Sequence, residues 1–393
     1  MRTAITLLFL CTLALIPAPS PAQDLAVPEL ERIWEYRPAL VTTVLARDGQ
    51  VIGYLYREKR FLKDLEDLPE HLVLAFLAAE DASFYEHEGI DLTAIFRAFS
   101  RNIQAGAIVQ GGSTITQQLV KRLLLTTERS YARKLKEAIL AYRLEKRLSK
   151  DRILEIYLND IFMGAGAYGV EAASQVYFGK HVEELTLAES ALLAGLPKAP
   201  STYNPYQNPE SAKNRQGYVL GRMLELNWIS QAEYDEAQNQ ELNFTSLPDP
   251  SWTLGAWYLE EVRRLLVEEL SEENMKLRGV RLDKFGEDAL YELGLTVYTA
   301  MDVDHQQAAE AALRRGLQDS SKRRGWQGPL ANLSQDEQAP FLAAMNTEYF
   351  PTDSIADVSE GQWIKVLITE VTKDKALALA GPFGATIPVD TMA

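Results

Sequence analysis

The residues best suited to acid–base chemistry lie in one acidic segment, residues 80–89, which begins with Glu80. The segment follows an apolar stretch that is expected to be helical, so Glu80 should lie at a helix end close to buried surface. A carboxylate that is partly removed from water has a raised pKa, which suits a general base. The alternative is a solvated acidic turn, and this segment alone does not decide between the two.

A second segment, residues 110–118, contains two glycines followed by hydroxyl side chains and leads towards Lys121. Such a loop at the start of a helix offers backbone N–H groups that can meet an anion or a sugar hydroxyl. Ser113 or Thr114 could equally serve as a plain helix cap. Capping and binding are compatible, so this segment by itself indicates no single function.

Basic residues are concentrated between residues 121 and 152, where eleven Lys and Arg stand against four Asp and Glu. A basic segment in an acidic protein favours an anionic partner such as phosphate, pyrophosphate or a membrane surface. Arg133 and Glu137 are four residues apart and would share one helix face. They could form a pyrophosphate clamp beside a second carboxylate, or only a surface ion pair.

Apolar spacing predicts the helices that must carry these residues. One helix is expected at 131–148, with the apolar stripe Leu135, Ala138, Ile139 and Tyr142. The next is expected to have the stripe Ile153, Leu154, Tyr157 and Leu158. We expect structural roles for Tyr157 and for Asn159, which should tie loops together.

The other elements follow from alternation and turn residues. Residues 40–57 predict a β-hairpin around Gly49, and a helix should begin after Pro69. Residues 80–240 are mainly helical in pattern. Helices near 255–270 and 304–317 should flank a strand near 293–300, and residues 360–390 resemble short strands of a small β-barrel.

Composition excludes several functions. The 393 residues carry a net charge of −15, which argues against general nucleic-acid binding. The four histidines are widely spaced and the single cysteine is Cys11, so no zinc-type spacing and no disulfide within the chain are expected. Residues 3–16 are apolar and three prolines follow, which predicts a signal peptide or a membrane anchor and therefore export.

Together, the motifs E-D-x-x-F-x-x-H-x-G, G-G-S-T-I-T-Q-Q, R-K-x-x-E and I-L-E-x-Y-L-N resemble those of the family 51 peptidoglycan glycosyltransferases over residues 40–245. Residues 215–223 continue this resemblance. Residues 293–302 and 324–329 resemble the linker of class A, bifunctional penicillin-binding proteins. No Ser lies three residues before a Lys and no Lys-Thr-Gly occurs, so we expect the chain to stop before the transpeptidase domain.

The resemblance implies a mainly α, lysozyme-like glycosyltransferase domain, followed by an α/β linker and a small β-rich, OB-like domain. The expected parts are a signal peptide or membrane anchor at 1–22, an N-terminal β-hairpin segment at 23–65, the glycosyltransferase domain at 66–245, a linker region at 246–318 and an incomplete OB-like insert at 319–393.

The resemblance also implies an inverting enzyme that polymerises lipid II into β-1,4-linked glycan and releases undecaprenyl pyrophosphate. Glu80 would be the general base for the 4-hydroxyl of the acceptor sugar, and Glu137 the second catalytic carboxylate. The cations implied to hold the donor pyrophosphate are Lys121, Arg129, Arg133 and Lys134. The other implied substrate-binding residues are Asp81, His87, Ser113, Thr114, Gln117 and Gln118.

No organic cofactor is expected. Glu137 would position either those cations or a divalent ion, Mg²⁺ or Mn²⁺. The implied partners are lipid II, the growing glycan chain, the cytoplasmic membrane and other cell-wall synthesis proteins, with no nucleic acid. The enzyme would work on the outer, periplasmic face of the cytoplasmic membrane, with an apolar jaw at about residues 93–125 entering the bilayer.

Two other functions use the same features. A lysozyme-like glycan-cleaving enzyme would also need a carboxylate, but its leaving group carries no phosphate and requires no basic segment. An inactive membrane-tethered cell-wall scaffold would need no intact site. The presence of Glu80, Glu137, Lys121 and Arg133 counts against that reading.

Overall fold

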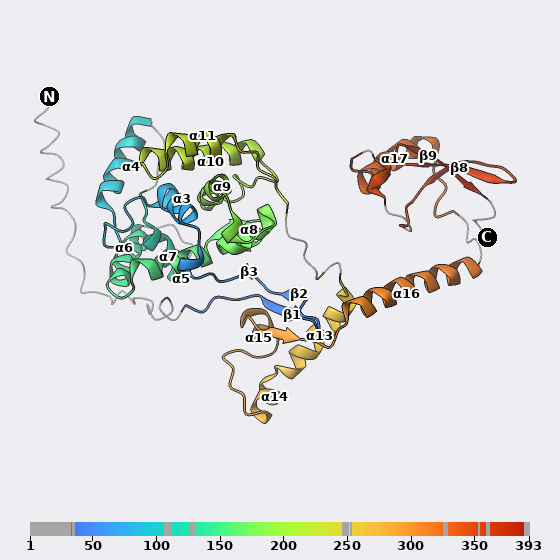
Figure 1. Cartoon of the computed structure of the whole chain (residues 1–393), viewed down its shortest axis with the longest axis horizontal. Coiled ribbons are helices and arrows are strands. Elements are labelled where there is room, and N and C mark those ends of the chain that lie inside the picture. Colours follow the sequence, from blue (N-terminus) through green and yellow to red (C-terminus); the bar gives the residue numbers. More distant parts are fainter. Residues whose placement is uncertain are drawn as a thin grey trace, which may run out of the picture. The chain divides into compact units, whose positions relative to one another are not determined.

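A computed structural model describes residues 33, 36–105, 112–125, 131–245, 251, 254–324, 329–352, 354–358 and 362–388. The chain divides into two compact units, Met1–Ala300 and Met301–Ala393, each considered by itself (Figure 1). The expected leader at 1–22 and Arg129 lie outside the described residues. The prediction of a mainly α protein with a small β-rich part is confirmed.

The first unit is built chiefly of helices, as its sequence pattern predicts. Between residues 70 and 240 they are α3 (Glu70–Glu80), α4 (Leu92–Ala105), α5 (Ile115–Leu124), α6 (Tyr131–Glu145), α7 (Lys150–Asp160), α8 (Gly169–Phe178), α9 (Leu187–Gly195), α10 (Pro209–Glu225) and α11 (Gln231–Asn239). Three single-turn helices join them: η2 (Leu65–Asp67), η3 (Val182–Glu184) and η4 (Leu196–Lys198). Helices α3, α9 and α10 pack on one another, and α5 packs on α6 and α7.

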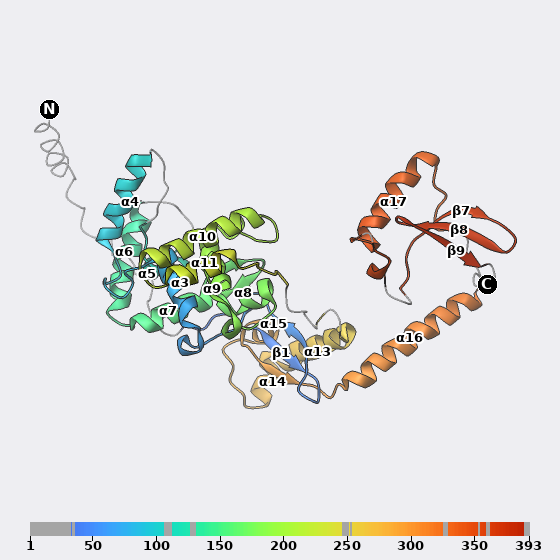
Figure 2. The ribbon, with the colours of Figure 1, turned by 45° about the horizontal axis from the view of Figure 1, so that its top comes forward.

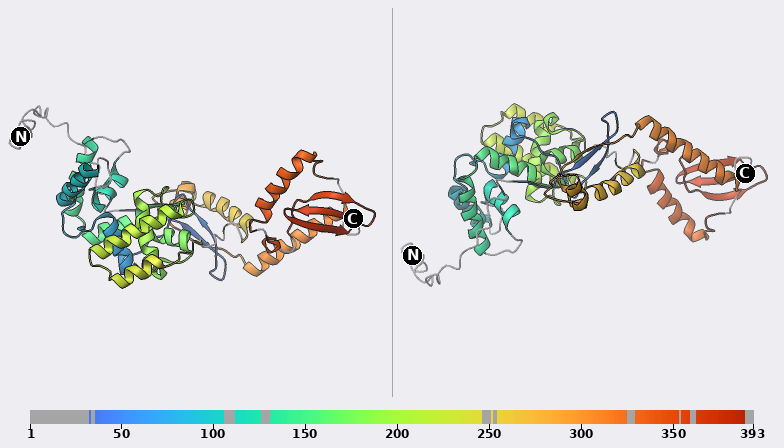
Figure 3. Two further views of the ribbon diagram at one scale, coloured as in Figure 1. Left: turned by 90° about the horizontal axis from the view of Figure 1, so that it is seen from above. Right: turned by 90° about the horizontal axis from the view of Figure 1, so that it is seen from below.

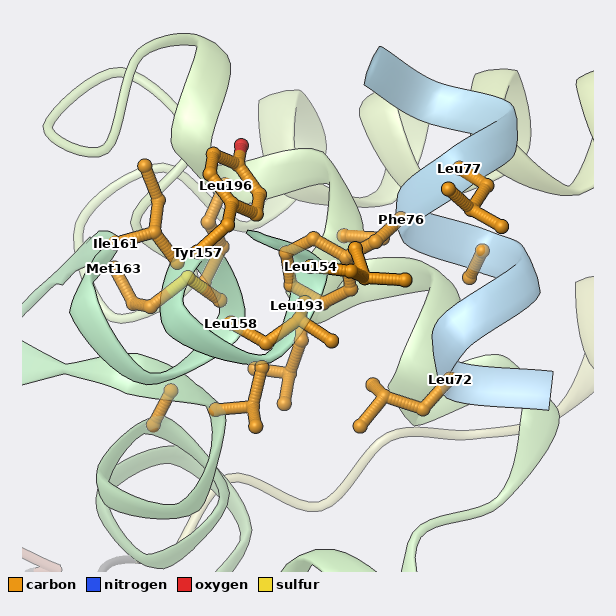
Figure 4. Packing of buried hydrophobic residues seen from close by; sticks show 14 of the residues in the cluster. Leu72, Phe76, Leu77, Leu154, Tyr157, Leu158, Ile161, Met163, Leu193 and Leu196 are labelled. Carbon is orange, nitrogen blue, oxygen red and sulfur yellow. The ribbon is translucent and has the colours of Figure 1, made fainter. Parts of the chain in front are cut away.

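One apolar core cluster, to which α4 contributes no residue, joins the other helices between residues 70 and 240 (Figure 4). Phe76 of α3 and Leu193 of α9 are fully buried in it. The predicted α7 stripe is confirmed, because the core also takes Ile153, Leu154, Tyr157 and Leu158 at 0% exposure. Removing such side chains from water stabilises a fold by roughly 1.5–3 kcal/mol each, so α3, α7 and α9 form a firm base for the residues at their ends.

The predicted stripe of α6 is wrong. The side chains that α6 buries are Glu137, Leu140, Ala141 and Leu144, whereas Leu135 and Tyr142 are 59% and 46% exposed. The helix rests on α5 and on the loop at Gly89, so its buried face is set by those neighbours rather than by its most apolar side. An apolar side of α6 is therefore left exposed.

The predicted N-terminal hairpin is confirmed, and it belongs to a small α/β body (Figure 2). Strand β1 (Thr42–Leu45) pairs antiparallel with β2 (Val51–Leu55) and parallel with β6 (Thr296–Tyr298). The body is completed by α13 (Ala256–Glu269), α14 (Glu272–Leu277) and α15 (Gly286–Glu292). A separate short sheet near the helices contains β3 (Lys59–Arg60), β4 (Phe162–Gly164) and β5 (Ala167–Tyr168).

The second unit contains α16 (Val303–Arg323), α17 (Gln335–Tyr349), η5 (Ile355–Asp357) and an antiparallel sheet of β7 (Leu367–Val371), β8 (Lys375–Ala380) and β9 (Phe383–Pro388) (Figure 3). These strands confirm the prediction of short strands at residues 360–390, whereas the small β-barrel stays a prediction. The sheet packs on α17 through the alanines of β8 and through the ring contact of Phe350 with Phe383. Within the described residues of both units, no helix has the length and apolarity needed to cross a bilayer.

Candidate active site

A pocket of about 210 Å³ lies where α3 ends. Its wall combines the end of α3, the following turn, α4, the start of α5, the end of η4 and α10. The residues singled out in the sequence that line it are Glu80, Asp81, Ser113, Thr114 and Gln118. Segments that are far apart in the chain therefore supply one polar cavity.

Glu80 is the last residue of α3, and the chain leaves the helical conformation at Asp81, where φ is −161°. Gln118 donates from Nε2 to Oε2 of Glu80 at 2.8 Å. Burial raises the pKa of Glu80, while the hydrogen bond from Gln118 and the charges of Arg215 and Lys198 oppose that rise. The result is a partly buried carboxylate in a pocket, with a pKa above its ordinary value, as a general base requires.

Asp81 fastens α5 to the end of α3. Its Oδ2 accepts the backbone N–H of Ile115 at 3.0 Å, and both of its oxygens lie 3.1 Å from Nε2 of His87. Thr114 and Gln117 form a capping box at the same helix end, and the Thr114 hydroxyl donates to the Gly89 carbonyl at 2.7 Å. These contacts set the direction of α5 and so bring Gln118 to Glu80.

The basic cluster on α6 surrounds a buried carboxylate. Glu137 is 2% exposed, with Oε1 3.2 Å from Nε of Arg133 and Oε2 2.8 Å from Nζ of Lys134. Lys134 also donates to the hydroxyl of Ser113 at 2.6 Å, so the cluster reaches the pocket wall. Because each oxygen of Glu137 faces a cation, this set of groups suits the positioning of those cations and does not fit a metal ligand.

A second cluster of potential metal ligands lies away from the pocket lining. Within the described chain, the one set of side chains whose ligand atoms are close enough for an ion is Glu171, His181 and Glu183. None of them lines the pocket. Glu171 also accepts from the backbone N–H of Val182 at 2.9 Å, which gives it a capping role.

Three of the implied pyrophosphate contacts, Lys121, Arg133 and Lys134, do not line the pocket. Lys121 is exposed on α5, and the fourth, Arg129, lies outside the described residues. Lys121 is followed by Arg122, which instead binds the carboxylate of Asp160 at 2.8 Å.

The pocket contains cations to which the sequence motifs assigned no role: Arg97, Lys198, Arg215 and Arg222. Arg215 is 7% exposed, donates from Nε to the Gly195 carbonyl at 3.2 Å and stacks 4.5 Å over the ring of Tyr218. Arg215 and Arg222 lie in the segment 215–223 that continued the family resemblance. That resemblance was the sequence signal that could have identified them as pocket residues. Lys198 is the last residue of η4, and the sequence offers no comparable signal for it.

The arrangement can perform one type of chemistry well. A carboxylate with a raised pKa can take a proton from a hydroxyl group, and nearby cations can stabilise negative charge that develops on a leaving group. Both components are present within one cavity.

Known proteins resemble this chain closely. Residues 48–224 match the family model of the transglycosylases. Penicillin-binding protein 1A of Neisseria lactamica is 39% identical over 93% of this chain and 43% of its own length, and that of Aquifex aeolicus (strain VF5) is 44% identical over 76% and 39%. The crystal structure of penicillin-binding protein 1A from Haemophilus influenzae aligns with 89% of this chain and 39% of that chain at 26% identity and a TM-score of 0.44. The chain thus spans less than half the length of the relatives it matches.

Proposed function

From the premise that residues 48–224 of this chain are a transglycosylase domain, we propose that the chain is a peptidoglycan glycosyltransferase that polymerises lipid II into β-1,4-linked glycan strands. The observation that carries the proposal is Glu80, a carboxylate with a raised pKa in a pocket that also contains Lys198 and Arg215. Such a site suits transfer from a donor whose leaving group is anionic.

In the proposed reaction, Glu80 takes the proton from the 4-hydroxyl of the acceptor sugar. The freed oxygen forms a bond to C1 of the donor sugar, and the bond between C1 and the pyrophosphate oxygen breaks. Its electron pair leaves with undecaprenyl pyrophosphate, and the α-linked centre becomes β-linked. The barrier falls because the base is desolvated and the charge of the leaving group is compensated.

Compensation of that charge is assigned to two groups of cations. Lys198 and Arg215 act from the side of the pocket near Glu80. Arg133 and Lys134, held by Glu137, act from the edge at Ser113. Lys121 and Arg129 remain part of the proposal as contacts of the pyrophosphate. No step is assigned to a divalent ion, since the surroundings of Glu137 are cationic.

The proposal extends to the setting of the enzyme. We place it at the outer face of the cytoplasmic membrane, working with other cell-wall synthesis proteins. Exposed apolar side chains along α4 support insertion of that helix into the bilayer, and they are Leu92, Ile95, Phe96 and Ile103. A lysozyme-like architecture for the helical domain and an OB-like one for the β-rich unit belong to the same proposal.

The test is incubation of the full chain with purified lipid II, followed by separation of the products. The wild-type chain should form glycan polymer, and Glu80→Gln should lower the rate by about 10²–10⁴-fold while remaining folded. Glu86→Gln is the matched control, because Glu86 is exposed in the same segment and does not line the pocket. Near-normal polymerisation by folded Glu80→Gln would refute the assignment.

The same assay separates the alternatives. Release of soluble fragments from preformed glycan, without polymer, would indicate a lysozyme-like glycan-cleaving enzyme. The absence of any reaction by a folded, membrane-reconstituted chain would favour the scaffold.

A further inference from the structure

Three side chains from three helices form a continuous hydrogen-bonded line that ends at the pocket. Tyr157 of α7 is fully buried, and its hydroxyl donates to Oε1 of Gln118 at 3.4 Å. Gln118 of α5 in turn donates from Nε2 to Oε2 of Glu80 at 2.8 Å. The line therefore runs from the core of the helical domain to the candidate base.

The chemistry of the three groups orients this line. An ionised carboxylate can only accept hydrogen bonds, so the NH₂ end of the Gln118 amide must face Glu80. The carbonyl end then faces Tyr157, whose hydroxyl can donate to it. Rotating the amide by half a turn would set the carbonyl oxygen against the carboxylate, which places two acceptors opposite each other. The Tyr157 hydroxyl favours the orientation in which Glu80 receives a donor.

The supporting elements are rigid. Gln118 lies between Leu119 and Gln117, which are 0% and 2% exposed, and the start of α5 is held by Asp81. Tyr157 lies on the buried stripe of α7. Both side chains therefore project from packed helices, and α5 and α7 also pack on each other, which keeps Tyr157 and Gln118 in place relative to one another.

We propose that Tyr157 and Gln118 are positioning residues that hold Glu80 by its Oε2 and leave its Oε1 to take the proton from the acceptor hydroxyl. This inference rests on the function proposed above and deepens it. Within the described residues, Gln118 provides the one hydrogen bond to this carboxylate. Tyr157 does not contact Glu80 directly and acts by orienting the side-chain amide of Gln118.

Tyr157→Phe removes the hydroxyl and little volume. The carbonyl of Gln118 then has no donor, the amide can rotate, and ionised Glu80 loses the N–H that favours its charged form. The pKa of Glu80 should rise. Polymerisation should fall by about threefold to tenfold at pH values where Glu80 is partly protonated, which is the effect expected from one hydrogen bond, and should approach the wild-type rate at higher pH.

The matched control is Tyr177→Phe. Tyr177 is equally buried, and its hydroxyl donates to the Met163 carbonyl at 3.0 Å rather than to Glu80 or Gln118. This variant loses the same atom from the same core. It should leave the shape of the pH–rate profile unchanged.

A second measurement needs no substrate. Water-soluble carbodiimides modify protonated carboxyl groups, so the labelling of Glu80, followed by peptide mass spectrometry, reports its protonation at each pH. The midpoint of labelling should move to higher pH in Tyr157→Phe and not in Tyr177→Phe. In the Gln118→Met background, adding Tyr157→Phe should not shift the labelling midpoint further, because the amide that links Tyr157 to Glu80 is already absent.

An unchanged labelling midpoint in folded Tyr157→Phe would overturn the inference, as would a rate loss that is equal at every pH. A further shift in the Gln118→Met background would also overturn it. If the wild-type chain formed no polymer, the proposed function would fail by itself, and the labelling experiment would still decide whether Tyr157 and Gln118 control Glu80.

Discussion

Ionised Glu80 lowers the stability of the folded chain. Burial raises its pKa in the folded chain above the value it has when unfolded. The protonated form therefore favours folding, and this contribution is present at low pH and is lost as the pH rises through the folded pKa. At neutral pH the folded chain must hold a partly buried charge, which Gln118, Arg215 and Lys198 offset only in part.

We therefore predict that Glu80→Gln makes the first unit more stable at neutral pH while it lowers the polymerisation rate by about 10²–10⁴-fold. The gain should shrink as the pH falls, because protonated Glu80 is as neutral as glutamine. Thermal unfolding of the full chain at a series of pH values measures this, with Glu86→Gln as the control that should show no such trend. A midpoint difference that is independent of pH would contradict the prediction.

At the residue scale, the sequence predicted the motif residues of the pocket better than its cations. Glu80, Ser113, Thr114 and Gln118 lie in short motifs, and they do line the cavity. Lys198 and Arg215 come from segments more than 100 residues beyond Glu80, outside the stretch with the highest basic density. Charge density along a chain indicates where cations are frequent, but only tertiary packing determines which of them meet.

At the scale of elements, Gly89 controls the contact between the loop after α3 and helix α6. Its φ is +84°, and a Cβ added there would lie 2.7 Å from the backbone of Ala141 and Tyr142. Real Cβ atoms do not approach backbone so closely, so a side chain at this position must push α6 away. The carbonyl of Gly89 also accepts the hydroxyl of Thr114 at the start of α5.

We predict that Gly89→Ala destabilises the first unit by about 3 kcal/mol or more, measured by chemical denaturation. Gly49→Ala is the control, since Gly49 has a φ of +89° and nothing within 4 Å of an added Cβ. Its cost should be only the backbone term of about 1–2 kcal/mol. Equal losses in the two variants would show that the contact with α6 is unimportant.

Helix α6 also shows the limit of periodicity. Its sequence offers apolar residues on more than one side, and spacing alone favoured the side with Leu135 and Tyr142. The side that packs contains Leu140, Leu144 and the charged Glu137. A carboxylate can be buried there because Arg133 and Lys134 compensate it, and no pattern based on hydrophobicity registers such a pair. In α7, where one side alone is apolar, the apolar spacing predicted the buried face correctly.

At the scale of the molecule, the N-terminal hairpin depends on chain that follows the helical domain. Strand β1 pairs with β6, and the side chain of Thr42 accepts the N–H of Leu295, 253 residues away. Arg57 adds an ion pair to Asp288 at 2.7 Å. The hairpin and the strand near residues 293–300 were both predictable from the sequence, whereas their pairing was not, because parallel pairing across such a separation has no local signature.

We predict that a chain ending at residue 245 loses the order of the hairpin but keeps the helical core. Without β6 and α13, Val44 and Ile52, both now fully buried, would face water. Hydrogen exchange at residues 42–55 should become about tenfold faster or more, while α3 and α9 stay protected. A chain ending at residue 300, which retains the whole first unit, is the control and should match the full chain. Unchanged protection in the shorter chain would contradict the dependence.

The pairing of β1 with β6 also has a consequence for the order of events during biogenesis. A ribosome delivers residues 42–55 long before residues 296–298, and everything from α3 to α11 is made in between. The apolar side of the hairpin stays exposed while the helices from α3 to α11 are made and can already pack on one another. Closing so distant a contact is slow compared with helix formation. The earliest strands to leave the ribosome should therefore be among the last to reach their final place, and the α/β body is expected to be the part of the first unit most in need of a chaperone.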